Sequence, residues 1–75
     1  MQLVLVEVTW QDVLQDSTWS THESVACPVV RSVGWLAHED KKTLKIGTTV
    51  SHDGEISAIL ALPKGCVISC RTLDY

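Results

Sequence analysis

The sequence predicts an all-β fold, a small barrel of five short strands. Three observations support this: apolar and polar residues alternate along most of the chain, turn-forming residues separate the alternating segments at short intervals, and glycines interrupt two of those segments. Of the 75 residues, 45% are hydrophobic and 20% are charged, as in globular rather than disordered chains. A single domain over residues 1–75 would bury only about 60% of its unfolded surface, so oligomerisation would stabilise it.

Residues 3–10 form the first predicted strand, because apolar and polar side chains alternate there. One face carries valines and a tryptophan, whereas the other face begins with leucines and ends at Glu7. This pattern is typical of a strand that is well buried at its start. The apolar run within it is too short for a signal peptide or a membrane span.

Residues 11–28 break the alternation and predict a long ordered loop that holds at most a short helical turn. A loop of about 18 residues is uncommon in so small a domain unless it is functional or packs as a lid. We expect Trp19, in the middle of this loop, to anchor it over the barrel. The acidic residues of the loop argue against phosphate contact by its surface (Asp12, Asp16 and Glu23).

Four further strands follow, each bounded by turn-forming residues. They are predicted over residues 29–38, 43–50, 55–62 and 66–73, with turns at residues 39–42, 51–54 and 63–65. Asp53-Gly54 supplies the positive φ that tight hairpins require, and Pro63 cannot donate to a strand ladder. Gly34 and Gly47, inside two of these strands, indicate the bulges or bends that a five-stranded barrel needs in order to close.

The order of these elements narrows the architecture further. A strand, a long loop, a three-strand meander, a one-turn break and a last strand follow the plan of SH3-like barrels, which include the Sm-like folds. No internal repeat, low-complexity tract or linker interrupts the order. The sequence therefore predicts a five-stranded SH3-like or Sm-like small barrel with a long loop between its first two strands.

The three cysteines, an odd number, indicate free thiols in a reducing cytoplasm rather than a disulfide framework. Cys66 and Cys70 would share a strand face roughly 13 Å apart, which is too far for one zinc ion or for a disulfide. Cys27 and the histidines could add ligands, but no Cys-x-x-Cys knuckle is present. We therefore expect no metal and no cofactor, and we expect the thiols to be buried or partly buried packing groups.

The sequence contains none of the motifs that commonly mark an enzyme. No glycine-rich phosphate loop, paired-carboxylate signature or His-Glu-x-x-His motif occurs. The histidines stand in the loop, at a strand end and in a turn, without a nucleophile motif nearby (His22, His38 and His52). We expect a protein that is not an enzyme and has no catalytic residues.

The basic residues and the tryptophans supply the candidate binding site. The formal net charge of −3 and the pI of about 5.4 oppose non-specific nucleic-acid binding. Arg31 and Trp35 share a strand face, so the guanidinium could hold a phosphate while the indole stacks a base. The alternative is that Trp35 belongs to the core and Arg31 caps its edge. Lys64, at the corner beside Gly65, and Arg71 in the last strand extend the candidate set.

Three stretches together carry a resemblance to known proteins. They are residues 8–12 (VTWQD) followed by Trp19, residues 31–36 (RSVGWL) with Glu39-Asp40, and residues 62–69 (LPKGCVIS) continuing to Leu73. This combination resembles a group of short proteins encoded by tailed bacteriophages, which implies action by binding in the cytoplasm of a bacterial host. The last stretch also looks like the final strands of Sm-like barrels, which would imply rings whose subunits pair through the fourth and fifth strands.

The first hypothesis is a non-enzymatic, phage-type binding protein, a homo-oligomer that acts in counter-defence or host takeover. It would capture a small nucleotide, such as a cyclic nucleotide, or a host or defence protein. For a nucleotide, Arg31, Lys64 and Arg71 would meet phosphates and Trp35 would stack a base, with Trp19 as a lid. Two alternatives stay open: an Sm-like RNA- or DNA-binding module, which the acidic charge disfavours, and a structural or protein-docking barrel without a small ligand.

Overall fold

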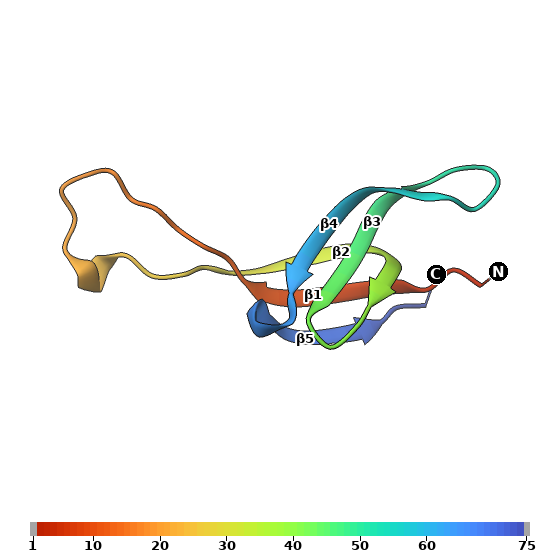
Figure 1. Ribbon diagram of the computed structural model, residues 1–75. Helices are drawn as coiled ribbons and strands as arrows, with labels where there is room; N and C mark the ends of the chain where they lie inside the picture. Colours follow the sequence, from red (N-terminus) through yellow and green to blue (C-terminus); the bar gives the residue numbers. More distant parts are fainter. Residues whose placement is uncertain (1, 75) are drawn as a thin grey trace.

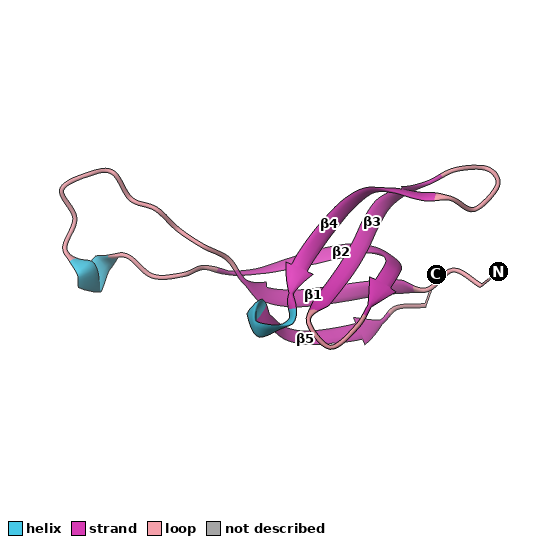
Figure 2. Ribbon diagram, in the orientation of Figure 1, coloured by secondary structure: helices cyan, strands magenta, loops and turns pink. Residues whose placement is uncertain are grey.

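All five strands lie in one antiparallel sheet with the order β4-β3-β2-β1-β5 (Figure 1). The computed structural model describes residues 2–74. The strands are β1 (Leu5–Gln11), β2 (Val29–Glu39), β3 (Thr43–Val50), β4 (Ile56–Pro63) and β5 (Val67–Thr72). Two short 3-10 helices, η1 (His22–Ser24) and η2 (Lys64–Cys66), are coloured as helices in Figure 2. The described residues contain no α-helix. The predicted all-β class and the five strands are therefore confirmed.

The strand order places β1 between β2 and β5, so the first and last strands of the chain pair with each other. The third strand has the predicted bounds, and the other strands differ from the prediction by one or two residues at their ends. The last strand begins at Val67 because residues 64–66 form η2, which makes the corner between β4 and β5. None of the helical segments described is long and apolar enough to cross a membrane.

The core lies between two halves of the bent sheet. In Figure 1, β3 and β4 cross over β1, β2 and β5, so that one face of each half meets the other. This inner face carries five apolar side chains that are at most 3% exposed (Val6, Val8, Leu44, Ile46 and Leu62). Trp10 packs against them and donates its indole N–H to the Ser32 hydroxyl at 3.0 Å. The alternation seen in the sequence therefore places Val6 and Val8 of β1, and Leu44 and Ile46 of β3, in the core.

Two glycines make the bend possible. A Cβ at Gly34 would lie 2.9 Å from the carbonyl oxygen of Gly47. A Cβ at Gly47 would lie 2.3 Å from Ile56 Cγ2 and 2.7 Å from the Ser57 carbonyl oxygen. Real Cβ atoms do not approach other atoms so closely, so only glycine fits both positions. This close packing explains why glycine stands at both positions.

The bend does not close the sheet into a barrel. β4 and β5 are joined through η2, but they form the two edges of the sheet and do not pair with each other. Ala58, inside β4, has a φ of +56°, a left-handed conformation that kinks the strand. Beyond this kink the β3–β4 hairpin leads away from β5 (Figure 1). The sheet is therefore an open half-barrel, and the expected self-closing of its edges is not observed.

Residues 12–28, here called the arm, extend away from the sheet (Figure 1). The pairing of β1 with β2 continues to Gln11 and Val29, and the Asp12 amide then donates to the Pro28 carbonyl oxygen at 2.8 Å. Both legs of the arm consequently leave the sheet in line with the strands. Trp19 is fully exposed, at 105% of its reference area. The expectation that Trp19 anchors this segment over the barrel is wrong, because the strand ladder directs the arm outward.

The two hairpin turns are ordered by short polar side chains. Asp40 Oδ1 accepts the amides of Lys42 and Thr43 at 2.8 Å. The hydrogen bond from His38, followed by those two amides, lowers the pKa of Asp40 to about 2. In the other turn Gly54 has a φ of +91°, which confirms the conformation expected from Asp53-Gly54.

The substitution Gly47→Ala tests the bend. The added methyl would meet Ile56 and the backbone of Ser57, so we expect it to lower the free energy of unfolding by about 1–3 kcal/mol. Gly65→Ala is the matched control, because a Cβ there meets nothing within 4 Å. Urea denaturation followed by circular dichroism would measure both. Equal stability of the two variants would contradict the argument.

Candidate functional site

Three of the five proposed ligand residues share one face of the sheet. The inner face of β1 carries Val6 and Val8, and the opposite face, here called the outer face, carries its odd-numbered residues. On the outer face Trp35 lies opposite Leu5, and Arg31 lies opposite Thr9. Arg71 lies opposite Glu7 from the other side of β1. The predicted common face of Arg31 and Trp35 is confirmed, and Trp35 is half-buried there rather than part of the inner core.

Glu7 occupies the position between the two arginines. Arg71 Nε donates to Glu7 Oε1 at 2.9 Å, and the Glu7 side chain is 19% exposed. This hydrogen bond, and to a smaller extent the charges of Arg71 and Arg31, lower the pKa of Glu7, so its carboxylate remains ionised. A phosphate at this position would have to displace that carboxylate. Sequence reasoning missed Glu7, because the pairing of β1 with β5 is needed to bring it beside Arg71.

Lys64 and Trp19 lie apart from the other three residues. Lys64 Nζ forms an ion pair with Glu39 at 2.6 Å, at the corner made by η2. Its backbone amide donates to the Lys42 carbonyl oxygen at 2.8 Å, which places this corner beside the β2–β3 turn. Trp19 stands on the arm. The five candidate residues therefore do not converge on one pocket.

The outer face combines exposed apolar side chains with basic ones. Val29, Val33 and Ile59 are 59%, 48% and 47% exposed. Ile59 and Trp35 flank Gly47, which pairs with both of them. Lys45 also lies on this face, because the buried residues Leu44 and Ile46 on either side of it point inward. With Arg31 and Arg71, the outer face is an apolar surface with three basic side chains and one carboxylate.

The tip of the arm is ordered by one carboxylate. Asp16 Oδ1 accepts the amide of Thr18 at 2.8 Å and its hydroxyl at 2.5 Å. Asp16 Oδ2 accepts the hydroxyl of Ser20 at 2.9 Å. These hydrogen bonds, chiefly the one from the Thr18 side chain, lower the pKa of Asp16. The bonded residues lie on both sides of Trp19 in the sequence, so an ordered loop holds the exposed indole. Aspartate often accepts a hydrogen bond from the backbone amide two residues further on, and this turn signal at Asp16 could have identified the tip.

The arm also differs from the sheet in charge and exposure. It contains three acidic residues and no lysine or arginine. The other six acidic residues equal the six basic residues in number, so the formal net charge of −3 resides entirely on the arm. Val13 and Leu14 on the arm are 81% and 50% exposed. The arm is therefore an acidic segment that displays apolar side chains.

The cysteines are more exposed than predicted. Cys27 and Cys70 are exposed and Cys66 is half-buried, so the expectation of buried or partly buried thiols is wrong for the first two. Cys70 lies opposite Val8 on the inner side of β5, but the open sheet leaves it uncovered. Partial desolvation, followed by the charge of Glu39, raises the pKa of Cys70. Among residues 2–74, no three metal-ligating side chains gather at one point.

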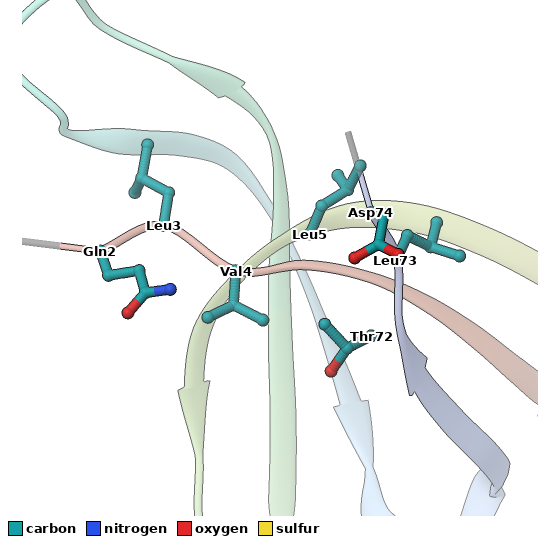
Figure 3. A pocket seen from close by; sticks show the side chains of 7 residues that line it. All are labelled: Gln2, Leu3, Val4, Leu5, Thr72, Leu73 and Asp74. Carbon is teal, nitrogen blue, oxygen red and sulfur yellow. The ribbon is translucent and has the colours of Figure 1, made fainter.

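A pocket of about 240 Å³ lies where the chain enters β1 and leaves β5 (Figure 3). Leucines and Val4 line it, together with Gln2, Thr72 and Asp74. The described residues of its lining include no basic side chain and none of the five candidate ligand residues. The pocket is therefore a poor match for a phosphate-bearing ligand.

Comparison with family models, curated proteins and solved structures finds no match for this chain. The candidate site is therefore defined by geometry. It has two parts, the arm with its ordered tip and the outer face of the sheet.

Replacing Asp16 with alanine tests the tip. Loss of its hydrogen bonds should free the Thr18 amide, which we expect to exchange with solvent several-fold faster in NMR measurements. The melting temperature should stay within about 4 °C of the wild type, because the substitution is exposed. Glu23→Ala removes the same charge from the arm without touching these hydrogen bonds, and should leave the exchange of Thr18 unchanged. Equal exchange in both variants would show that Asp16 does not order the tip.

Proposed function

We propose that this protein is a non-enzymatic docking protein that uses its arm to bind a partner protein. The observation that carries this proposal is Trp19, fully exposed at the tip that Asp16 orders. Exposure of an indole to water is unfavourable, and tryptophan is enriched among the residues that dominate protein interfaces. Ordering of the tip before binding lowers the entropy cost of association.

The charge of the arm favours a protein partner over nucleic acid. Its three carboxylates would repel a phosphate backbone, and the arm has no lysine or arginine to offset them. A partner groove with an apolar floor and basic rim would match the indole and the carboxylates together. The resemblance to short phage proteins makes a host or defence protein in the bacterial cytoplasm the partner class that we propose, with counter-defence or host takeover as its outcome.

Trp19→Ser tests the docking role. Pull-down from a host lysate with tagged full-length protein should yield a stoichiometric partner, whose affinity for the purified variant should fall by about tenfold or more. The substitution removes no buried contact, so the melting temperature should stay within about 4 °C of the wild type.

Gln15→Ala is the control for this experiment, because it alters another exposed side chain of the arm outside the Asp16 hydrogen bonds. It should bind the partner as the wild type does. Failure to find a partner, or equal affinity of Trp19→Ser and wild type, would refute the docking role of the arm.

Capture of a small nucleotide is the second candidate, favoured by the common face of Arg31, Trp35 and Arg71. It requires release of Glu7 from Arg71, so Glu7→Gln should raise the affinity for an anionic ligand. Calorimetric titration with cyclic di- and trinucleotides would measure this, with Arg31→Ala as the variant that should lose affinity. Absence of micromolar binding by wild type and Glu7→Gln would exclude this candidate.

A further inference from the structure

The two parts of the candidate site are complementary to each other. The outer face exposes Val29, Val33 and Ile59 among Arg31, Arg71 and Lys45, with Glu7 as its acidic residue. The arm exposes Val13, Leu14 and Trp19 among three carboxylates. Both surfaces therefore combine apolar side chains with charge, and the charges are of opposite sign.

Arg31 is the basic residue of the outer face that is best placed to meet the arm. Its side chain is exposed and, among the residues that the structure describes, has no acidic group within ion-pair distance. Arg71 is held by Glu7. Among the described residues, the carboxylates of the arm interact only within the arm: Asp16 accepts hydrogen bonds from Thr18 and Ser20, and Glu23 forms an ion pair with His22. Within the described part of the chain, Arg31 of the outer face and Asp12 and Asp16 of the arm therefore have no ion-pair partner.

We infer that the arm of one molecule docks on the outer face of a second copy, and that the two copies exchange arms about a two-fold axis. Trp19, Val13 and Leu14 of each arm cover Val29, Val33 and Ile59 of the other copy. The carboxylates of the arm lie near Arg31 and Lys45 of the same face. The two-fold axis makes this contact form twice, so the two buried surfaces add together. Specific interfaces bury roughly 1,200–2,000 Å² in total.

A second copy is a better occupant than the chain's own arm. Both legs leave the sheet in line with β1 and β2, held by the hydrogen bond from the Asp12 amide to Pro28. The arm thus extends the molecule to a length of 50 Å against a width of 23 Å. Folding back onto its own sheet would require this ladder end to break, whereas docking on another copy leaves it intact.

This inference rests on the proposed docking role of the arm, and it explains how partner binding by the arm would be regulated. The same indole cannot contact a partner protein and a second copy at once. Self-association therefore masks the arm at high protein concentration, and a partner competes with the dimer for Trp19.

Sedimentation velocity of the purified full chain, from roughly 1 μM to 1 mM, tests the dimer. The apparent mass should rise from 8.3 kDa toward twice that value, and tryptophan emission should shift to shorter wavelength over the same concentrations as Trp19 becomes buried. Association should weaken as salt is added, because opposite charges meet across the interface.

Three variants locate the interface. Trp19→Ser and Arg31→Glu should each weaken the dimer by about tenfold or more. Lys41→Glu makes the same charge change as Arg31→Glu but lies in the β2–β3 turn, so it should dimerise as the wild type does. A mass of 8.3 kDa at every concentration would overturn the inference, and so would a dimer that neither Trp19→Ser nor Arg31→Glu weakens.

The same variants separate this inference from the proposed function. Arg31→Glu should lose the dimer and still bind a partner through its intact arm. A wild-type protein that stays monomeric but binds a partner through Trp19 would refute the arm exchange and leave the docking role in place. Formation of the dimer without any partner that binds through Trp19 would refute the docking role and leave the arm exchange in place.

Discussion

The close approach of two backbones at Gly34 and Gly47 is the constraint on which this structure depends. At that point β2 and β3 come near enough for the sheet to bend and bring Leu44 and Ile46 over Val6 and Val8. Small domains bury little surface, so loss of this contact would leave each half of the sheet with one apolar face in water. On the other side, Gly47 leaves the space that Ile56 and Ile59 fill. The same glycine therefore shapes both faces of the sheet.

The architecture of the sheet could be predicted because its determinants are local. The alternation from Thr43 to Val50 and the Asp53-Gly54 turn specify strands and a hairpin without reference to distant residues. Closure of a barrel is a property of the whole sheet. It requires β4 and β5, the two edge strands, to pair, and no local pattern in either strand reports whether they do. The left-handed conformation of Ala58 in β4 is equally without a sequence signal, because alanine rarely adopts it. The exposure of Cys70 follows from the same open edge.

The candidate site was harder to predict, because it depends on which segments the fold brings together. The shared face of Arg31 and Trp35 follows from strand periodicity and could be read from the sequence. The position of Glu7 beside Arg71 requires the pairing of residues far apart in the chain, and Lys64 has its own partner in Glu39. Trp19 is predicted to anchor the loop over the barrel, because tryptophan is usually at least partly buried. Its exposure follows from the ladder end at Gln11 and Val29, which no local pattern reveals.

The separation of charge within the chain links these features. A sheet whose acidic and basic residues balance, joined to an arm that holds the entire net charge, has no electrostatic reason to repel its own arm or that of a second copy. Self-repulsion would follow if the same charge were spread evenly over the surface. In the proposed dimer, the arm instead meets a face with more basic than acidic side chains. The apolar residues exposed on both surfaces then supply the short-range attraction, and the charges select the orientation in which they meet.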